Sequence, residues 1–192
     1  KALIEYHLAA LQQAGVEDVI INHAWLGDQI ASRLGSGEQY GLRIEYSAEI
    51  PEALETAGGI IQALPRLGSG PFMVINGDIW CDYPFQQLPR YPDGLAHLVM
   101  VDNPPHNPQG DFCLINGDLQ AEGDSKLTYS GIGVFHPQLF AGLAPGIRPL
   151  APLLKKAMAS NQVRGEHYQG RWYDIGTPER LAELNLQLES QR

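Results

Sequence analysis

Two aspartates in this chain stand where an α/β sheet could present carboxylates to a ligand. Asp78 ends the sequence Ile75-Asn76-Gly77-Asp78, which directly follows a short apolar run that predicts a strand. Open α/β sheets bind ligands at the carboxyl ends of their strands, and Gly77 would let a phosphate or a sugar approach the backbone. Carboxylates suit Mg²⁺, which takes one or two of them together with waters and substrate phosphates. We therefore predict a Mg²⁺ ligand at Asp78; the alternative is a turn in which Asp78 caps a helix.

Asp174 is the second candidate for metal chemistry. Thr177, Pro178 and Glu179 are explained structurally, as the N-cap, the first helical position and an acidic residue in the first turn of a helix. That helix start does not explain Asp174, which follows two aromatic residues at the end of a predicted strand. Paired with Asp78, Asp174 would complete a two-carboxylate Mg²⁺ site. The alternative is a solvated side chain.

The tetrapeptide Ile-Asn-Gly-Asp occurs a second time, at residues 115–118, between two short segments of alternating hydrophobicity. Asn-Gly is the pair that favours the two-residue type I′ turn of a β-hairpin. We therefore interpret this second copy as a surface turn without a chemical role.

Small residues at the start of a predicted helix, within residues 54–59, form a third candidate site. We expect Thr56 to be the N-cap. Exposed backbone N–H groups there could contact a phosphate, and the absence of bulky side chains would let a flat base lie close. The alternative is an ordinary loop and helix start.

Two glycine-containing segments could line a sugar pocket. Gly110 and Asp111 follow a rigid loop with three prolines in residues 103–108, and Ser130-Gly131 interrupts a predicted strand. Glycine inside a strand often marks a bulge or the close approach of a ligand. The alternative in both places is a bend that packing requires.

Helix and strand patterns alternate over the first half of the chain, which predicts an α/β fold with mostly parallel strands and right-handed crossovers. Residues 103–135 carry the proline-rich loop, the hairpin and a strand, and predict a small antiparallel insertion. Helices are expected at residues 3–14, 28–34, 57–64, 153–159 and 178–188. Strands are expected at residues 19–22, 42–46, 72–75, 95–101, 112–115, 119–121 and 129–135.

The composition excludes several classes of protein. Hydrophobic residues make up 44% and charged residues 18% of the 192 residues, which is typical of a globular domain. The net charge of −9 and the lack of clustered Lys and Arg argue against nucleic acid as a partner. No apolar run is long enough to span a membrane, and two cysteines are too few for a disulfide framework. With no signal peptide recognised, we expect a cytoplasmic protein, and the sequence indicates no protein partner.

The chain opens on a helical pattern, whereas doubly wound domains usually open on a strand that carries the phosphate-binding loop. We therefore expect residues 1–192 to be a single, N-terminally truncated domain whose first strand and loop are missing.

Four segments, in this order, resemble sugar-1-phosphate nucleotidyltransferases: residues 54–59, 74–78, 129–133 and 172–180. Residues 19–27 and 106–112 are most similar to the branch of that family that acts on N-acetylmuramate 1-phosphate, and mannose-1-phosphate guanylyltransferases are similar too. The resemblance implies a three-layer Rossmann-like fold and a Mg²⁺-dependent reaction. In it, UTP and N-acetylmuramate 1-phosphate would give UDP-N-acetylmuramate and pyrophosphate, in peptidoglycan recycling.

The resemblance also implies roles for individual residues. Asp78 and Asp174 would hold Mg²⁺. The nucleotide would contact Glu49, Glu55, Thr56, Ala57, Gly58, Gly59, Asn76 and Gly77. The sugar would contact Asn76, Gly110, Asp111, Ser130 and Gly131, with residues 103–135 lining its side of the site.

The chain departs from the family at its beginning. The glycine-rich loop with an arginine and the Pro-Lys segment that bind the triphosphate in this family are not in the sequence. This departure implies that the natural protein is an active transferase, while the chain as written is either impaired in activity or an incomplete representation of that protein. The alternatives are a mannose- or glucose-1-phosphate nucleotidyltransferase, or a domain that binds sugar nucleotides without turnover.

Overall fold

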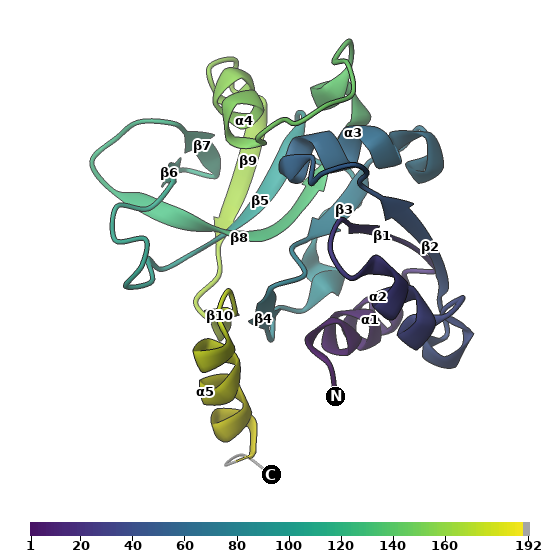
Figure 1. Ribbon diagram of the computed structural model, residues 1–192. Helices are drawn as coiled ribbons and strands as arrows, with labels where there is room; N and C mark the ends of the chain where they lie inside the picture. The colour runs from purple at the N-terminus through teal and green to yellow at the C-terminus, as the bar shows by residue number, and fades with distance from the viewer. Residues whose placement is uncertain (190–192) are drawn as a thin grey trace.

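The computed structural model describes residues 1–189 and shows an α/β fold (Figure 1). The helices are α1 (Leu3–Gln13), α2 (Gly27–Leu34), α3 (Glu55–Leu67), α4 (Ala151–Met158) and α5 (Pro178–Glu189). The strands are β1 (Asp18–His23), β2 (Arg43–Ala48), β3 (Phe72–Ile75), β4 (Ile79–Cys81), β5 (Ala96–Val101), β6 (Phe112–Ile115), β7 (Asp118–Gln120), β8 (Lys126–Phe135), β9 (Val163–His167) and β10 (Trp172–Asp174). Every helix and strand expected from the periodicity is present, whereas β4 and β9 were not predicted.

The strands form three sheets. β1 and β2 pair in parallel, β4 and β10 pair antiparallel, and the largest sheet has the order β3-β8-β5-β9-β7-β6. In that sheet β8 runs antiparallel to β3 and to β5, while β9 is parallel to β5. β3, β5 and β9 therefore point the same way, with β8 reversed between β3 and β5.

The α/β fold class is confirmed, but the expectation of mostly parallel strands is wrong for the pairings seen in residues 1–189. Parallel pairing is confined to β1–β2 and β5–β9. The reason is the route of the chain, because β8 is reached from β5 through the β6–β7 hairpin and not through a crossover helix. A hairpin delivers antiparallel strands, whereas a parallel neighbour requires a long crossover. The hairpin itself is as predicted, with positive φ at both Asn116 and Gly117.

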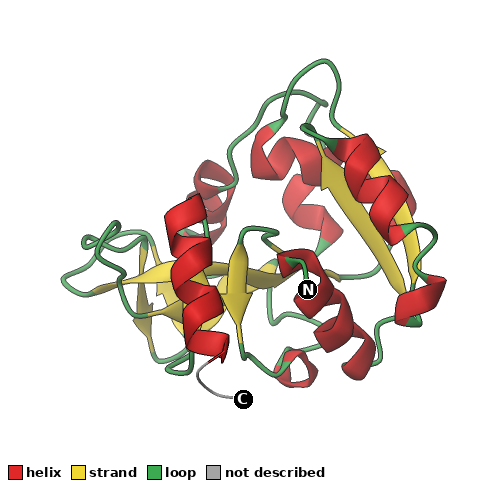
Figure 2. Cartoon of the chain, turned by 60° about the horizontal axis from the view of Figure 1, so that its bottom comes forward, coloured by secondary structure: helices red, strands yellow, loops and turns green. Residues whose placement is uncertain are grey.

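The largest apolar core lies around β5, whose Leu98 and Met100 are fully buried, and it extends to α3 and α4. A second core joins α1 to β3, β4 and β8, and a third joins α1 and α2 to β1 and β2. The helices therefore pack around the sheets, and both ends of the described chain lie on one side of the molecule (Figure 2). Within residues 1–189, every helix is too short or too polar to cross a membrane.

A buried histidine ties α1 to β4. His7 is 7% exposed, and its Nε2 lies 2.8 Å from the carbonyl oxygen of Ile79. A carbonyl can only accept, so Nε2 carries the hydrogen. Burial lowers the pKa of His7, which keeps the ring neutral. Because Ile79 follows Asp78 in the chain, this bond also anchors the turn that carries Asp78.

We expect the burial of His7 to make the free energy of unfolding depend on pH. Its pKa is lower in the folded chain than in the unfolded chain, where it is about 6.5. The unfolded chain therefore binds the proton more readily, and the free energy of unfolding falls as the pH drops below about 6.5. His7→Gln keeps an N–H donor that does not titrate, so the fall should be smaller. Urea denaturation at pH 7.5 and 5.5 measures the fall in the wild-type and His7→Gln proteins. An equal fall in the two proteins would show that His7 does not cause the pH dependence.

Candidate active site

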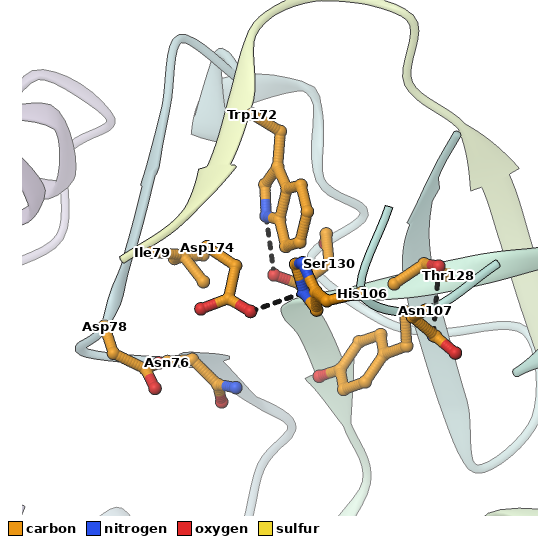
Figure 3. Close-up of a pocket in the computed structure, with 10 residues that line it drawn as sticks. Asn76, Asp78, Ile79, His106, Asn107, Thr128, Ser130, Trp172 and Asp174 are labelled. Atoms are coloured by element: carbon orange, nitrogen blue, oxygen red, sulfur yellow. Dashed lines mark hydrogen bonds and ion pairs between the residues drawn. The ribbon is translucent and has the colours of Figure 1, made fainter. Parts of the chain in front are cut away.

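A cavity of about 230 Å³ opens between the segment that joins β3 to β4, the first half of β8, and β10 (Figure 3). It is lined by Asn76, Asp78, Ile79, His106, Asn107, Thr128, Tyr129, Ser130, Trp172 and Asp174. Both predicted metal ligands are among these residues, together with two of the predicted sugar contacts, Asn76 and Ser130.

The pairing of β4 with β10 brings the two aspartates together. Asp174 is paired in register with Ile79, and the N–H of Ile175 donates to the carbonyl of Asp78 at 2.7 Å. Because a strand follows Asp78 directly, the alternative in which Asp78 caps a helix is wrong. The carboxylates of both residues and the amide of Asn76 face the same space (Figure 3).

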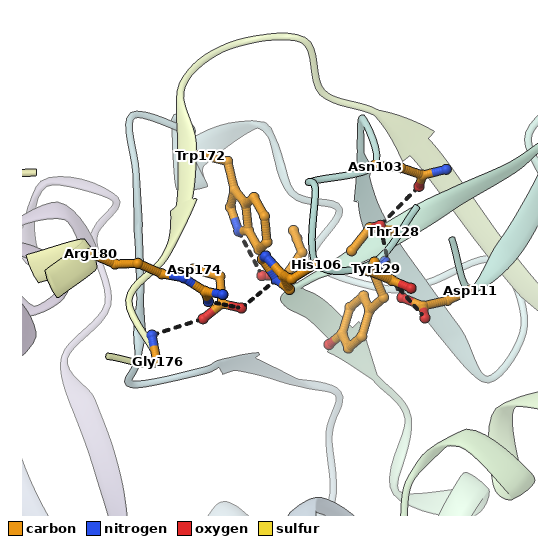
Figure 4. Close-up of polar contacts among 11 residues, drawn as sticks. Asn103, His106, Asp111, Thr128, Tyr129, Trp172, Asp174, Gly176 and Arg180 are labelled. Atoms are coloured by element: carbon orange, nitrogen blue, oxygen red, sulfur yellow. Dashed lines mark hydrogen bonds and ion pairs between the residues drawn. The ribbon is translucent and has the colours of Figure 1, made fainter. Parts of the chain in front are cut away.

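Three groups fix the Asp174 carboxylate (Figure 4). Oδ2 lies 2.6 Å from His106 Nε2 and 3.1 Å from an Arg180 guanidinium nitrogen, while Oδ1 accepts from the N–H of Gly176 at 2.9 Å. By contrast, the Asp78 carboxylate has neither a hydrogen bond nor an ion pair with any other residue of the described part. One carboxylate is therefore held in place and the other is free to bind a ligand.

The start of α5 places Arg180 beside Asp174. The hydroxyl of Thr177 accepts from the N–H of Arg180 at 3.3 Å, so the predicted N-cap is confirmed. The sequence reasoning assigned no role to the Arg180 side chain or to His106. Arg180 could have been found from the sequence, because it lies in the first turn of a predicted helix that begins soon after Asp174.

The proline-rich loop is fastened to β8, which holds His106 over the cavity. Asp111 accepts from Asn107 Nδ2 at 3.1 Å through one carboxylate oxygen and from the N–H of Tyr129 at 2.8 Å through the other. Asn107 Nδ2 also donates to Thr128 Oγ1 at 3.1 Å. Asp111 therefore has a structural function in this loop, away from the cavity wall.

Packing explains why the two positions predicted on the sugar side are glycines. Gly110 has a φ of +63°, and a Cβ there would lie 2.8 Å from Asn103 Oδ1. Gly131 has a φ of +83°, and a Cβ there would lie 2.7 Å from Asn76 Cγ. Gly131 thus lets the Asn76 side chain occupy its place in the cavity wall. Neither glycine lines the cavity, and their contact with a sugar stays a prediction.

The N-terminus of α3 is capped by a backbone carbonyl from a distant loop. The helix begins at Glu55, and the carbonyl of Arg148 accepts from the N–H groups of Ala57 and Gly58 at 3.1 and 3.2 Å. The expectation that Thr56 is the N-cap is therefore wrong, because a carbonyl from a distant loop takes over that function. A Cβ on Gly58 would collide with the carbonyl oxygen of Gly146 in the same loop. These N–H groups are consequently already paired.

Glu49 supports the same helix start. Its carboxylate accepts from the N–H of Leu54 at 2.7 Å, and a Cβ on Gly59 would collide with Glu49 Oε1. Glu49 and residues 55–59 lie outside the cavity wall, and so does Gly77, around which there is open space. Their contact with a nucleotide stays a prediction.

The chemistry of the donor set fits Mg²⁺. Asp78 and Asp174 supply two carboxylates, which is the small number of protein ligands that Mg²⁺ takes. Among residues 1–189 there is no group of three or more His, Cys, Asp and Glu side chains arranged to hold a metal. The remaining coordination positions would therefore fall to water and to substrate phosphates.

Comparison with known proteins identifies the family. The model of a family described as nucleotidyl transferase matches residues 1–128. The chain belongs to the nucleotidyl transferase family. Proteins named N-acetylmuramate alpha-1-phosphate uridylyltransferase are similar to it. One from Neisseria meningitidis serogroup B is 47% identical, over 95% of this chain and 83% of that protein.

A second protein of that name, from Caulobacter vibrioides, is 31% identical over 93% of this chain and 81% of its own length. These relatives confirm the resemblance to sugar-1-phosphate nucleotidyltransferases. The fold of the family is also seen in a Bacillus anthracis protein crystallised with sucrose. That structure has a TM-score of 0.79 and 19% identity, over 96% of this chain and 81% of the other.

We expect Asp111→Ala to release the proline-rich loop. The substitution removes two hydrogen bonds to a carboxylate, and the free energy of unfolding should fall by about 1–3 kcal/mol. Hydrogen exchange measured by mass spectrometry should become faster in residues 103–111. Asp124→Ala, which removes an exposed carboxylate nearby, is the control and should change neither quantity. Unchanged exchange in the Asp111→Ala protein would show that the loop is held by other contacts.

Proposed function

We propose that the protein is a Mg²⁺-dependent uridylyltransferase that converts UTP and N-acetylmuramate 1-phosphate to UDP-N-acetylmuramate and pyrophosphate. The observation that carries the proposal is the convergence of Asp78 and Asp174 in one cavity of a nucleotidyl transferase fold. The choice of UTP and of N-acetylmuramate 1-phosphate rests on the names of the two relatives.

The reaction needs positioning more than it needs a reactive side chain. A phosphate oxygen of the sugar 1-phosphate forms a bond to the α-phosphorus of UTP. The bond from that phosphorus to the bridging oxygen of the β-phosphate breaks, and pyrophosphate leaves with the electron pair. Holding the two phosphates in line removes much of the entropic barrier, and no covalent bond to the protein is required.

Charge is the main obstacle, because both substrates are anions and the chain carries a net charge of −9. Mg²⁺, when bound, neutralises phosphate charge and orients the reacting oxygens. Asp78 and Asp174 would hold the ion. His106 and Arg180 hold Asp174 in a fixed orientation, which keeps one ligand ready before the substrates arrive.

The uncharged side of the cavity suits the sugar. Asn76 presents an amide without a hydrogen-bond partner among residues 1–189. Ser130 of β8, whose hydroxyl accepts from the N–H of Ile132 at 3.1 Å, lines the same cavity. Amides and hydroxyls can each donate to or accept from sugar oxygens. We also assign Gly110, Asp111 and Gly131 to the sugar, and Glu49, Gly77 and residues 55–59 to the nucleotide, on the family resemblance alone. A reaction of this kind would place the protein in the cytoplasm, in peptidoglycan recycling.

We expect pyrophosphate release by the full-length protein with UTP, N-acetylmuramate 1-phosphate and Mg²⁺. Asp78→Asn and Asp174→Asn should each lower kcat/KM at least about 100-fold, since each removes a metal-binding charge. Asp118→Asn, in the second Ile-Asn-Gly-Asp copy, is the matched control and should retain activity. Full activity in both site variants would refute the metal assignment.

The same assay separates the other candidate functions. Preferred turnover of GTP with mannose 1-phosphate, or of other nucleotides with glucose 1-phosphate, would replace the proposed substrates. Binding of UDP-sugars without turnover of any pair would indicate a domain that binds sugar nucleotides without catalysis.

A further inference from the structure

One buried hydroxyl in the cavity wall has no partner. In residues 1–189, the buried side-chain atoms without a hydrogen bond are Trp80 Nε1, His97 Nε2, Tyr129 Oη and Arg148 Nε. Of these four residues, Tyr129 is the one that lines the cavity with Asp78 and Asp174. Buried hydroxyls in proteins are nearly always paired, because an unpaired one has lost its water without compensation.

The protein holds this tyrosine in a fixed place. The N–H of Tyr129 donates to Asp111 at 2.8 Å, its backbone pairs with Met100 of β5, and its ring packs against the main apolar core. In Figure 4 the ring lies below His106, and its hydroxyl end is turned away from Asp111. Burial raises the pKa of Tyr129, so the hydroxyl stays protonated and available as a donor.

The surroundings decide what such a donor can bind. The uncharged Asn76, which follows β3, lines the same cavity and lies against Gly131 of β8. Thr128 and Ser130 flank Tyr129 on β8, and by strand alternation their side chains face the other side of the sheet. The carboxylates belong to Asp174, at the end of β10, and to Asp78, just before β4. The phenol is a neutral donor and brings no charge to offset that of a phosphate. An uncharged acceptor, such as a hydroxyl or an amide carbonyl, matches a neutral donor in neutral surroundings.

We infer that the Tyr129 hydroxyl donates a hydrogen bond to an uncharged oxygen of the sugar in the sugar 1-phosphate. Tyr129 is therefore a specificity-determining residue of the sugar subsite. This inference rests on the proposed function, because it takes the sugar 1-phosphate as the occupant of the cavity.

Tyr129→Phe tests the inference, since it removes the hydroxyl and keeps the ring. The KM for the sugar 1-phosphate should rise about tenfold, the size expected for one hydrogen bond. The KM for UTP should stay within about twofold of the wild-type value. The melting temperature should be unchanged or higher, because the free protein loses only an unpaired polar group.

Tyr83→Phe is the matched control. The Tyr83 hydroxyl is also buried, but it donates to Glu166, outside the cavity. Its loss should lower the melting temperature and leave both KM values unchanged.

The opposite pattern at Tyr129 would overturn the inference. A lower melting temperature with an unchanged KM for the sugar 1-phosphate would show a structural hydroxyl, and a raised KM for UTP alone would assign it to the nucleotide. Calorimetric binding of the sugar 1-phosphate to the wild-type and Tyr129→Phe proteins distinguishes this failure from that of the proposed function. Weaker binding to the variant supports the inference even if no nucleotide is turned over, and equal binding overturns it.

Discussion

The antiparallel pairing of β4 with β10 is the interaction on which the site depends. It joins Asp78, which directly precedes β4, to Asp174, which is far away in the sequence, through the register of Ile79 with Asp174. Packing supports the pairing from both sides. His7 of α1 anchors β4, and the capped start of α5 places Arg180 against Asp174. A few short-range bonds thus convert two separate strand ends into one binding surface.

Electrostatics supports the proposed binding of a cation at this surface. His106 and Arg180 both contact Asp174, whereas Asp78 forms no ion pair within residues 1–189. A divalent ion held by the pair, as proposed, would offset the repulsion between these carboxylates and two anionic substrates. The same arrangement divides the cavity, with carboxylates toward β4 and β10 and uncharged groups on β3 and β8.

Local patterns in the sequence predicted the helices, most strands, the hairpin at Asn116-Gly117 and the placement of both aspartates at strand ends. These features depend on periodicity and turn chemistry over a few residues. The reversed β8 could not be predicted in this way, because its direction depends on which strands it joins. The cap on α3 is the carbonyl of Arg148, and His106 reaches Asp174 from a loop that Asp111 and Asn107 help to fasten to β8. Such contacts between distant segments leave no local pattern.

We propose that Asp78 and Asp174 jointly bind one divalent ion. Mn²⁺ can replace Mg²⁺ in crystals grown with UDP-N-acetylmuramate, and its anomalous scattering locates it directly. We predict a single peak with a carboxylate oxygen of each aspartate about 2.1 Å away. A peak bound by one aspartate alone, or one outside the cavity, would contradict the account.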